Sequence, residues 1–436
     1  MATFSAALRH VKEHLDRLVP EDQVRQLCRD LGYRWRDRVL GPAVTVQLFL
    51  LQLLARVSMR GVGRVAELSV TAQAVCAAKM RLPLALLMEL VRRSAPAASS
   101  AGGGGGPTTW RGLPVYVADG TGVLAQDAAP VAGRYGKAKN QRGTGWGYPN
   151  PKLLALFDLE GGFVRRIIAL PWHRQEFTCL ARLFKALGRG ALALGDRGLA
   201  SFAHLALLLD QGAHGCFRLS RGQVVFGRGR ASRRRVRPLG RQDVLVRWQS
   251  GGRRPGWMSK TRWAALAGRE LTLRQIAFRV RRPGFRTHWA WIVTTLCDPV
   301  AYPAEELVEL YGKRWQVEVC FRDLKRTLGM SLLSAKTLAG TRKEILAFVL
   351  LYNLIRAAMG RAAARQGVAA DRVSFVDALR WLLWGTPGTP PPALAVNPVR
   401  RNRASPPRRV KSKGYQFPPL NGPRDELAKP PCEVML

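Results

Sequence analysis

The sequence predicts an α/β protein in which a helical region precedes a mixed-sheet core and a basic, strand-rich segment interrupts that core. Three observations support this fold class: apolar residues recur at helical spacing early in the chain, short apolar runs then alternate with helical stretches, and a later Arg-rich segment keeps strand-like alternation. A chain of 436 residues with 47% hydrophobic composition is long enough for about two or three domains.

The N-terminal region carries apolar residues at helical spacing. Val44, Leu48, Leu51 and Ala55 follow i, i+4, i+7 and i+11, and few turn signals interrupt the pattern. Residues 1–93 are therefore predicted to form a helical domain. The Gly/Ser/Pro-rich stretch 94–109 has the composition of a flexible linker and predicts a domain boundary.

The next part of the chain contains strand-like runs in a recognisable order. Three apolar runs come first, with Glu160-Gly161-Gly162 as a hairpin turn between the last two; a helix, a strand, a second helix and a strand follow. The segments are PVYVAD (114–119, its strand ending at Asp119), KLLALFDL (152–159), FVRRIIAL (163–170), 178–187, ALALGD (191–196), 201–211 and CFRLS (216–220). This order is typical of a ribonuclease-H-like core, which we assign to 110–217 and 287–385.

A basic segment, 218–286, separates the two parts of this core. It contains 20 Lys and Arg but only Asp243 and Glu270 as acids, and its Trp residues and apolar alternation predict a β-rich insertion. The alternative, an exposed loop, would be long for a compact domain. The apolar strand HWAWIVTTL follows, then a helix that begins near Pro303 and more helix over 341–384. The chain finishes with a basic, Pro-rich tail (386–436), which we expect to be largely disordered.

The charge balance predicts a polyanionic partner. The chain has 70 Lys and Arg against 29 Asp and Glu, a formal net charge of +41. Neutralisation of phosphates is the usual use of such an excess, so nucleic acid is the expected partner. A genome biased towards Arg is the alternative, but that bias does not explain the scarcity of acidic residues.

Cysteine and apolar patterns favour a soluble, cytoplasmic protein without membrane contact. The seven cysteines form no CxxC pair, so neither a zinc site nor a disulfide framework is indicated. Charged residues precede any apolar run at the N-terminus, unlike a secretory signal. The most apolar stretch, 43–55, is too short to span a bilayer.

Polar residues in one predicted helix, YGKRWQVEVCFRDLK (311–325), form the most informative pattern. At about 100° per residue, five polar side chains share an arc of roughly 80° beside an apolar face: Tyr311, Arg314, Glu318, Arg322 and Lys325. An exposed face stabilised by pairs such as Arg314 with Glu318 would explain the charges, but not Tyr311 or the spacing. Elsewhere, Asp119 and Asp196 each lie at the end of a predicted strand; either could be an ordinary turn or N-cap aspartate.

The spacing Tyr-x2-Arg-x3-Glu-x6-Lys resembles the YREK signature of bacterial insertion-sequence transposases of the fourth-insertion-element type. The matching residues are Tyr311, Arg314, Glu318 and Lys325. The resemblance implies that Asp119, Asp196 and Glu318 form a catalytic, metal-binding triad. It also implies that Tyr311, Arg314 and Lys325 contact DNA phosphates, and that Trp289, Trp291 or Trp315 stacks on a flipped base unless it is a core residue.

The resemblance further implies two Mg²⁺ ions, with Mn²⁺ as a substitute, and cut-and-paste transposition of DNA. The partners would be double-stranded DNA, both the terminal inverted repeats and the target, and a second copy of the chain in a homodimer associated with the nucleoid. The helical domain 1–93 would bind DNA. Two alternatives remain: a ribonuclease-H-like nuclease without transposition, and a DNA-binding protein without catalysis.

Overall fold

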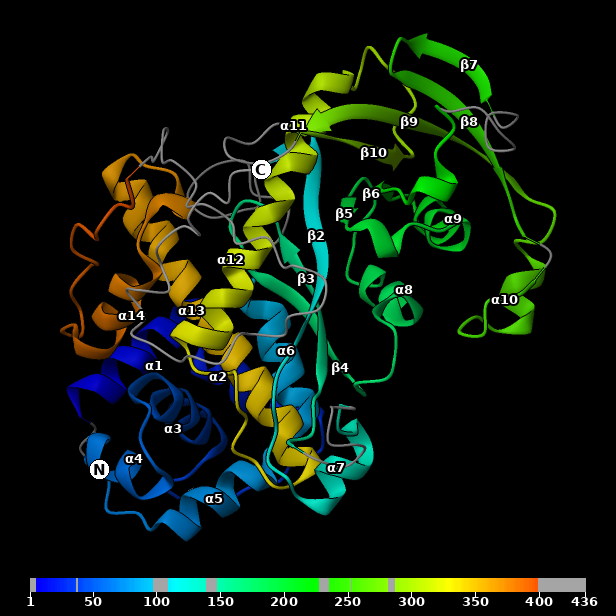
Figure 1. Ribbon diagram of the computed structural model, residues 1–436. Coiled ribbons are helices and arrows are strands. Elements are labelled where there is room, and N and C mark those ends of the chain that lie inside the picture. Colours follow the sequence, from blue (N-terminus) through cyan, green and yellow to red (C-terminus); the bar gives the residue numbers. More distant parts are fainter. Residues whose placement is uncertain are drawn as a thin grey trace, which may run out of the picture. The chain divides into compact units, whose positions relative to one another are not determined.

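The computed structural model describes residues 5–36, 38–96, 109–138, 147–226, 235–251, 253–280 and 287–398 (Figure 1). Most of the predicted linker, part of the Arg-rich segment and the tail from residue 399 lie outside these residues, so the predictions for them stand as predictions. Met1–Arg279 and Trp289–Pro398 group into one compact unit.

The N-terminal region is helical, as its apolar spacing predicts. Its helices are α1 (Ala6–Leu18), α2 (Glu21–Asp30), α3 (Pro42–Ala55), α4 (Met59–Val65), α5 (Ala72–Arg81) and α6 (Leu84–Ser94). Side chains of Ser5, Ser58 and Thr71 cap three of these helices by accepting hydrogen bonds from backbone N–H groups. Most side chains of α3 are buried, which identifies the apolar stretch 43–55 as a core helix.

The strands and helices of the central sheet follow one another along the chain as predicted for a ribonuclease-H-like core. It consists of β2 (Leu113–Gly122), β3 (Lys152–Asp158), β4 (Val164–Leu170), β5 (Leu192–Gly195) and β6 (His214–Arg218), ordered β4-β3-β2-β5-β6. The first three strands pair antiparallel, whereas β2, β5 and β6 pair parallel. The short helices α8 (Leu180–Phe184) and α9 (Phe202–Asp210) lie between strands in the chain, so the fold prediction is confirmed.

Strand β2 continues past Asp119, where the sequence predicted that it would end. Gly120, Thr121 and Gly122 pair with Leu154, Leu153 and Lys152 of β3 instead of forming a turn. Gly120-Thr121-Gly122 predicts a tight turn after Asp119, but pairing with β3 holds this segment extended.

The basic segment forms strands that extend the same sheet. Next to β6 lies the core strand β10 (His288–Thr294), which follows the segment in the chain. The segment's own strands come after it in the order β9 (Glu270–Val280), β8 (Asp243–Gln249) and β7 (Arg235–Gly240), and α10 (Lys260–Ala264) lies between β8 and β9 in the chain. Trp248 is buried in the core. The predicted β-rich insertion is thus found in the described part of 218–286, as the extension at the upper right of Figure 1.

The helix predicted near Pro303 departs from α-helical winding at two places. It runs through α11 (Ala304–Gly312), a 3₁₀ turn (Lys313–Trp315), α12 (Gln316–Arg322) and a π-helical turn (Asp323–Thr327). Each change of winding alters the angle per residue, so the uniform spacing used for the predicted stripe holds only within α12. A π turn inside a helix is rare and is frequent at functional sites.

Two hydrophobic cores cover the two faces of the sheet. Val115 and Val117 of β2 point towards the core that contains α12 and α13 (Leu338–Gln366), while Tyr116 and Ala118 point towards the core of α8 and α9. By length and composition α13 could cross a membrane, but 78% of its most apolar window is buried inside the protein. It packs against α3, α6 and α14 (Phe375–Trp384).

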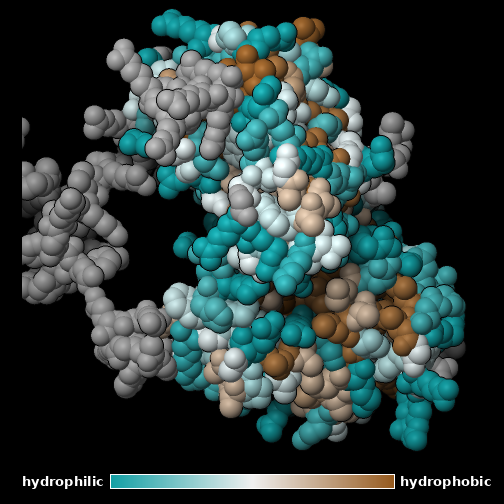
Figure 2. Space-filling view, turned by 90° about the vertical axis from the view of Figure 1, so that its right-hand side faces the viewer, coloured by the Kyte–Doolittle hydropathy of each residue, from teal (hydrophilic) through white to brown (hydrophobic). Residues whose placement is uncertain are grey.

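Figure 2 shows a face covered mainly by hydrophilic residues, with hydrophobic ones gathered mostly in its lower half.

Candidate active site

Asp119 and Asp196 lie next to each other, directly after the last residue pair that joins the parallel strands β2 and β5. Ala118 of β2 is in register with Gly195 of β5, and each aspartate is the next residue in its chain segment. Alternation along β2 turns Asp119 to the same face as Val115 and Val117, which is the face covered by α12. The parallel pairing therefore brings together two carboxylates that are 77 positions apart in the sequence.

Arg314 faces both aspartates from the helix. Its Nη1 lies 4.0 Å from Asp119 Oδ2 and its Nη2 lies 4.0 Å from Asp196 Oδ1, while its side chain is only 5% exposed. Both separations are longer than a hydrogen bond. Within the described residues, the buried Arg314 Nε and Asp196 Oδ1 have no hydrogen-bond partner. Arg314 thus points to the aspartates. The alternative, an exposed helix face on which Arg314 pairs with Glu318, does not describe this residue.

The surroundings of Asp119 favour its neutral, protonated form in comparison with an aspartate in water. Burial raises the pKa of Asp119 to about 6, against the opposing effects of a 2.8 Å hydrogen bond from the Gly120 N–H and of the Arg314 charge. The negative charges of Asp196 and Glu176 raise this pKa further. A cation placed between these carboxylates would remove that penalty.

Tyr311 and Lys325 connect the helix to the strand ends. The buried Tyr311 hydroxyl donates a hydrogen bond to the Gly195 carbonyl oxygen at 3.2 Å, directly before Asp196. Lys325 Nζ donates to Thr121 Oγ1 at 3.1 Å, two residues after Asp119. Burial lowers the pKa of Lys325 and raises that of Tyr311. In this structure both side chains contact the protein itself.

Glu318 is exposed on α12, one turn after Arg314, and does not join the two aspartates. No group of three His, Cys, Asp or Glu side chains in the described ranges is close enough to hold a metal ion. The structure therefore brings together Asp119, Asp196 and Arg314 from the predicted set, with Tyr311 and Lys325 beside them, and leaves Glu318 apart.

Three contacts in this region involve residues that sequence patterns did not select. Gly195 and Thr121 accept the hydrogen bonds of Tyr311 and Lys325, and Glu176 lies against Gly120. Such partners depend on tertiary packing. Among them, only Gly120 gave a sequence signal, because a glycine inside a strand can mark the close approach of another group.

The three tryptophans considered for base stacking have different settings. Trp315 is 45% exposed beside Arg314, and Trp289 is 37% exposed under the guanidinium of Arg279. Trp291 is partly buried against the core of α8 and α9. Trp289 and Trp315 therefore have ring surface that a base could reach.

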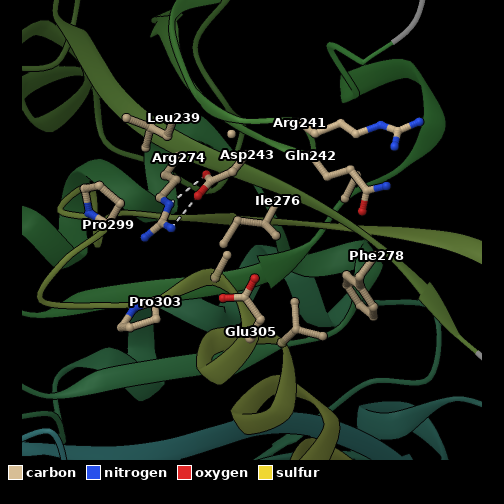
Figure 3. A pocket seen from close by; sticks show the side chains of 14 residues that line it. Leu239, Arg241, Gln242, Asp243, Arg274, Ile276, Phe278, Pro299, Pro303 and Glu305 are labelled. Carbon is tan, nitrogen blue, oxygen red and sulfur yellow. Dashed lines mark hydrogen bonds and ion pairs between the residues drawn. The ribbon is translucent and has the colours of Figure 1, made fainter.

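A cavity of about 610 Å³ lies between the insertion strands and the start of α11 (Figure 3). Its wall includes the buried ion pair of Asp243 with Arg274, and Glu305 of α11 also lines it. None of the candidate active-site residues lines this cavity.

The residues at the strand ends fit a hard divalent cation. Magnesium-type ions prefer carboxylate oxygens, and Asp119 and Asp196 present such oxygens side by side. The buried Oδ1 of Asp196 accepts no hydrogen bond within the described protein, and Arg314 Nη2, at 4.0 Å, is its ion-pair partner. Asp119 and Asp196 are therefore the residues able to hold a metal ion here.

A ribonuclease-H-like sheet with paired aspartates at adjacent strand ends defines a class of proteins that process nucleic-acid phosphodiesters. Within that class, the chain belongs to the transposase DDE domain family, which matches residues 110–354, more than half of the chain. Proteins of this family use divalent metal ions.

Individual relatives are more distant. The transposase InsG for insertion sequence element IS4 of Escherichia coli (strain K12) is 26% identical over 290 residues, which is 62% of this chain and 62% of that protein. The match thus spans less than two thirds of the relative's length. A piggyBac transposase in a synaptic complex with hairpin DNA has a TM-score of 0.46 and 9% identity, covering 85% of this chain and 78% of that one.

Proposed function

We propose that the protein is a DNA transposase that cuts phosphodiesters at the ends of an insertion element and joins the freed 3′-hydroxyl to target DNA. The observation that carries this proposal is the pair Asp119 and Asp196, side by side at parallel strand ends and faced by the buried Arg314. Membership of the transposase DDE domain family supports it.

Asp119, Asp196 and Glu318 would hold two Mg²⁺ ions, for which Mn²⁺ would substitute. When bound, the ions would activate the attacking oxygen and stabilise the leaving oxygen of an in-line displacement. Glu318 follows Arg314 by one turn, so the same helix carries both towards the DNA. Its exposure leaves its carboxylate available to this role.

The cationic residues of the helix would hold the DNA. Arg314 has a buried guanidinium with an unused Nε donor, and a phosphate oxygen is the acceptor that arginine pairs with best. Lys325 would contact a neighbouring phosphate. Tyr311 would act through Gly195 by fixing the strand end beside Asp196.

The proposed partners are double-stranded DNA, namely the terminal inverted repeats and the target, and a second copy of the chain that coordinates the two ends. The net charge of +41 supports a DNA partner. The protein would act in the cytoplasm on nucleoid DNA, with residues 1–93 contributing to DNA binding.

The test is cleavage and strand transfer by purified full-length protein on duplexes that carry the element ends. Asp119→Asn, Asp196→Asn and Glu318→Gln should each lower cleavage below detection, because every carboxylate is required, while binding to the ends persists. Asp127→Asn, an exposed aspartate paired with Lys137, is the matched control and should cleave normally. Normal cleavage by any of the three variants would remove that residue from the triad; cleavage without strand transfer would favour a nuclease.

A further inference from the structure

We propose that Arg56, from the helical N-terminal region, is a positioning residue of the proposed active site, because its side chain holds the end of the π-helical turn that carries Lys325. The inference rests on the proposed function, in which Lys325 contacts a DNA phosphate. Arg56 directly follows α3, and the turn Asp323–Thr327 directly follows α12. The contact therefore joins two regions that are 270 positions apart in the sequence.

The backbone of Arg56 adopts a conformation that is unusual for arginine. Arg56 ends α3 in the left-handed region, with φ 52° and ψ 39°. Glycine is the usual residue at such a helix end because it has no Cβ atom, and an L side chain in this conformation costs free energy. The contacts of the exposed Arg56 side chain are the interactions that glycine would lack.

These contacts are with the carbonyl end of the π-helical turn. Nη2 of Arg56 donates a hydrogen bond to the Thr327 carbonyl oxygen and another, at 3.4 Å, to the Arg326 carbonyl oxygen. Nε of Arg56 would lie 3.9 Å from a Cβ atom built on Gly329, so the guanidinium also lies beside the residues that leave the helix. Carbonyl groups at the end of a helix lack donors within the helix and carry partial negative charge, so a cation is favourable there.

The other carbonyl groups of the turn accept hydrogen bonds from the chain that follows it. The backbone bonds run from Leu328 to Asp323 at 2.8 Å, from Met330 to Leu324 at 3.2 Å and from Ser331 to Lys325 at 3.1 Å. Arg56 supplies the donor for the remaining two, so all five carbonyl groups of the turn are paired. Removing the Arg56 side chain would release the last two and loosen the end of the turn.

The winding of this turn sets the direction of Lys325. Lys325 is the third residue of the turn, and its Nζ donates to Thr121 Oγ1 at 3.1 Å, two residues after Asp119. A π turn places successive side chains at a different angle from an α-helix, so a return to α-helical winding would rotate Lys325 away from the end of β2. Arg56 thus acts on the site through Lys325 and connects the helical N-terminal region to it.

The first experiment measures single-turnover cleavage by the full-length protein at saturating concentrations of duplexes that carry the element ends. Arg56→Gly should lower the cleavage rate by about 10- to 100-fold, because Lys325 is misplaced. Its urea midpoint should stay close to that of the wild type, because the more favourable backbone conformation offsets the lost hydrogen bonds. Arg365→Ala is the matched control and should cleave like the wild type, since it removes an exposed arginine whose Nη1 donates to the Pro391 carbonyl oxygen at 3.0 Å.

Saturating DNA separates positioning from affinity. If Arg56 only attracts DNA, Arg56→Gly raises the Kd for the element ends and leaves the saturated rate unchanged, which would overturn the proposal. A large fall in the urea midpoint would also overturn it, because Arg56 would then stabilise the fold as a whole. Arg56→Asn tolerates the left-handed conformation as well, and it takes the place of Arg56→Gly if that variant does not fold.

A double-mutant cycle tests whether Arg56 acts through Lys325. Lys325→Met should slow cleavage, and adding Arg56→Gly in that background should slow it further by no more than about twofold, because both changes remove the same interaction. Losses that multiply fully would show that the two residues act separately and would overturn the proposal.

Asp119→Asn, measured beside these variants, distinguishes failure of this inference from failure of the proposed function. If Arg56→Gly cleaves at the wild-type rate while Asp119→Asn is inactive, the inference about Arg56 fails and the proposed function stands. If Asp119→Asn cleaves like the wild type, the proposed active site itself is wrong.

Discussion

Two buried arginines, one in the insertion and one beside the two aspartates, differ in how fully the protein satisfies them. Arg274 of β9 is completely buried and forms a two-pronged ion pair with Asp243, with Nε donating to Oδ1 at 2.8 Å. Its Nη1 donates to the Tyr302 carbonyl oxygen at 2.6 Å. Arg314 is almost as buried but lies 4.0 Å from each aspartate and leaves its Nε without a partner in the described chain.

The difference indicates what each arginine is for. A satisfied buried ion pair contributes to a specific fold, since removing one partner leaves an uncompensated charge. A buried guanidinium that lacks hydrogen bonds costs stability, and such costs persist at sites where a ligand supplies the missing contacts. Arg274 is thus a structural residue that ties β9 to β8 and to the loop before α11, whereas the unpartnered Nε of Arg314 is compatible with the proposed role in holding DNA.

Replacing each arginine with methionine tests this comparison most directly. Arg314→Met should slow DNA cleavage by about 10²- to 10³-fold, because it removes a charge aimed at the reacting phosphate, and it should leave the free energy of unfolding unchanged or slightly improved. Arg274→Met should lower the free energy of unfolding by about 3–5 kcal/mol, because Asp243 stays buried without its partner.

Urea unfolding followed by circular dichroism, with cleavage rates on the same preparations, provides the measurement. Adding Asp243→Leu to Arg274→Met should recover most of the lost stability, since the orphaned charge is then gone. If Arg314→Met destabilises the fold as much as Arg274→Met does, Arg314 is structural and the comparison collapses.

A buried histidine pair forms a second network, in which both rings have hydrogen-bond partners although Nε of Arg361 has none in the described chain. His10 Nε2 lies 3.0 Å from His14 Nε2, His10 Nδ1 lies 3.0 Å from the Leu382 carbonyl oxygen, and His14 Nδ1 lies 2.7 Å from Arg361 Nη2. The arrangement is consistent when Arg361 donates to His14, His14 to His10, and His10 to Leu382. Both rings are then neutral, and burial lowers the pKa of His14 to about 3.

This network should make the fold sensitive to acid. An unfolded histidine has a pKa of about 6.5, so between pH 6.5 and about 3 the unfolded chain binds protons that the folded chain excludes. The stabilisation is complete above pH 6.5 and is lost as the pH falls through this range. The wild type should therefore lose more stability between pH 7.5 and pH 5 than His14→Gln, as measured by urea midpoints. The exposed His173→Gln is the control, and equal losses in all three proteins would rule out the histidine pair as the cause.

Sequence patterns predicted those parts of the molecule that depend on local spacing. Short apolar runs identified the strands around Asp119 and Asp196, and helical spacing of apolar residues identified the helices before the linker, because both patterns report which residues are buried. The YREK spacing selected Arg314, which the structure places against both aspartates. The pairing of β2 beyond Asp119, the contact of Glu176 with Gly120 and the 3₁₀ and π turns of the helix arise from long-range packing, which spacing does not encode.

The smallest expected effect concerns Tyr311, where two hypotheses differ in what they predict. The family resemblance implies a hydrogen bond from this hydroxyl to the DNA backbone, whereas the structure shows it buried and donating to the Gly195 carbonyl oxygen. If the internal bond is its function, Tyr311→Phe should lower the free energy of unfolding by about 1 kcal/mol, because a buried carbonyl loses its donor. Cleavage should then fall only a few-fold, since the end of β5 beside Asp196 becomes less well fixed. Affinity for the element ends, measured in an Asp119→Asn background that cannot cut, should not change. Tyr148→Phe, which removes a hydroxyl from a half-exposed ring, is the control and should leave the free energy of unfolding, cleavage and DNA affinity unchanged. Weaker DNA binding by Tyr311→Phe with unchanged stability would instead assign the hydroxyl to the DNA and require it to leave Gly195 in the complex.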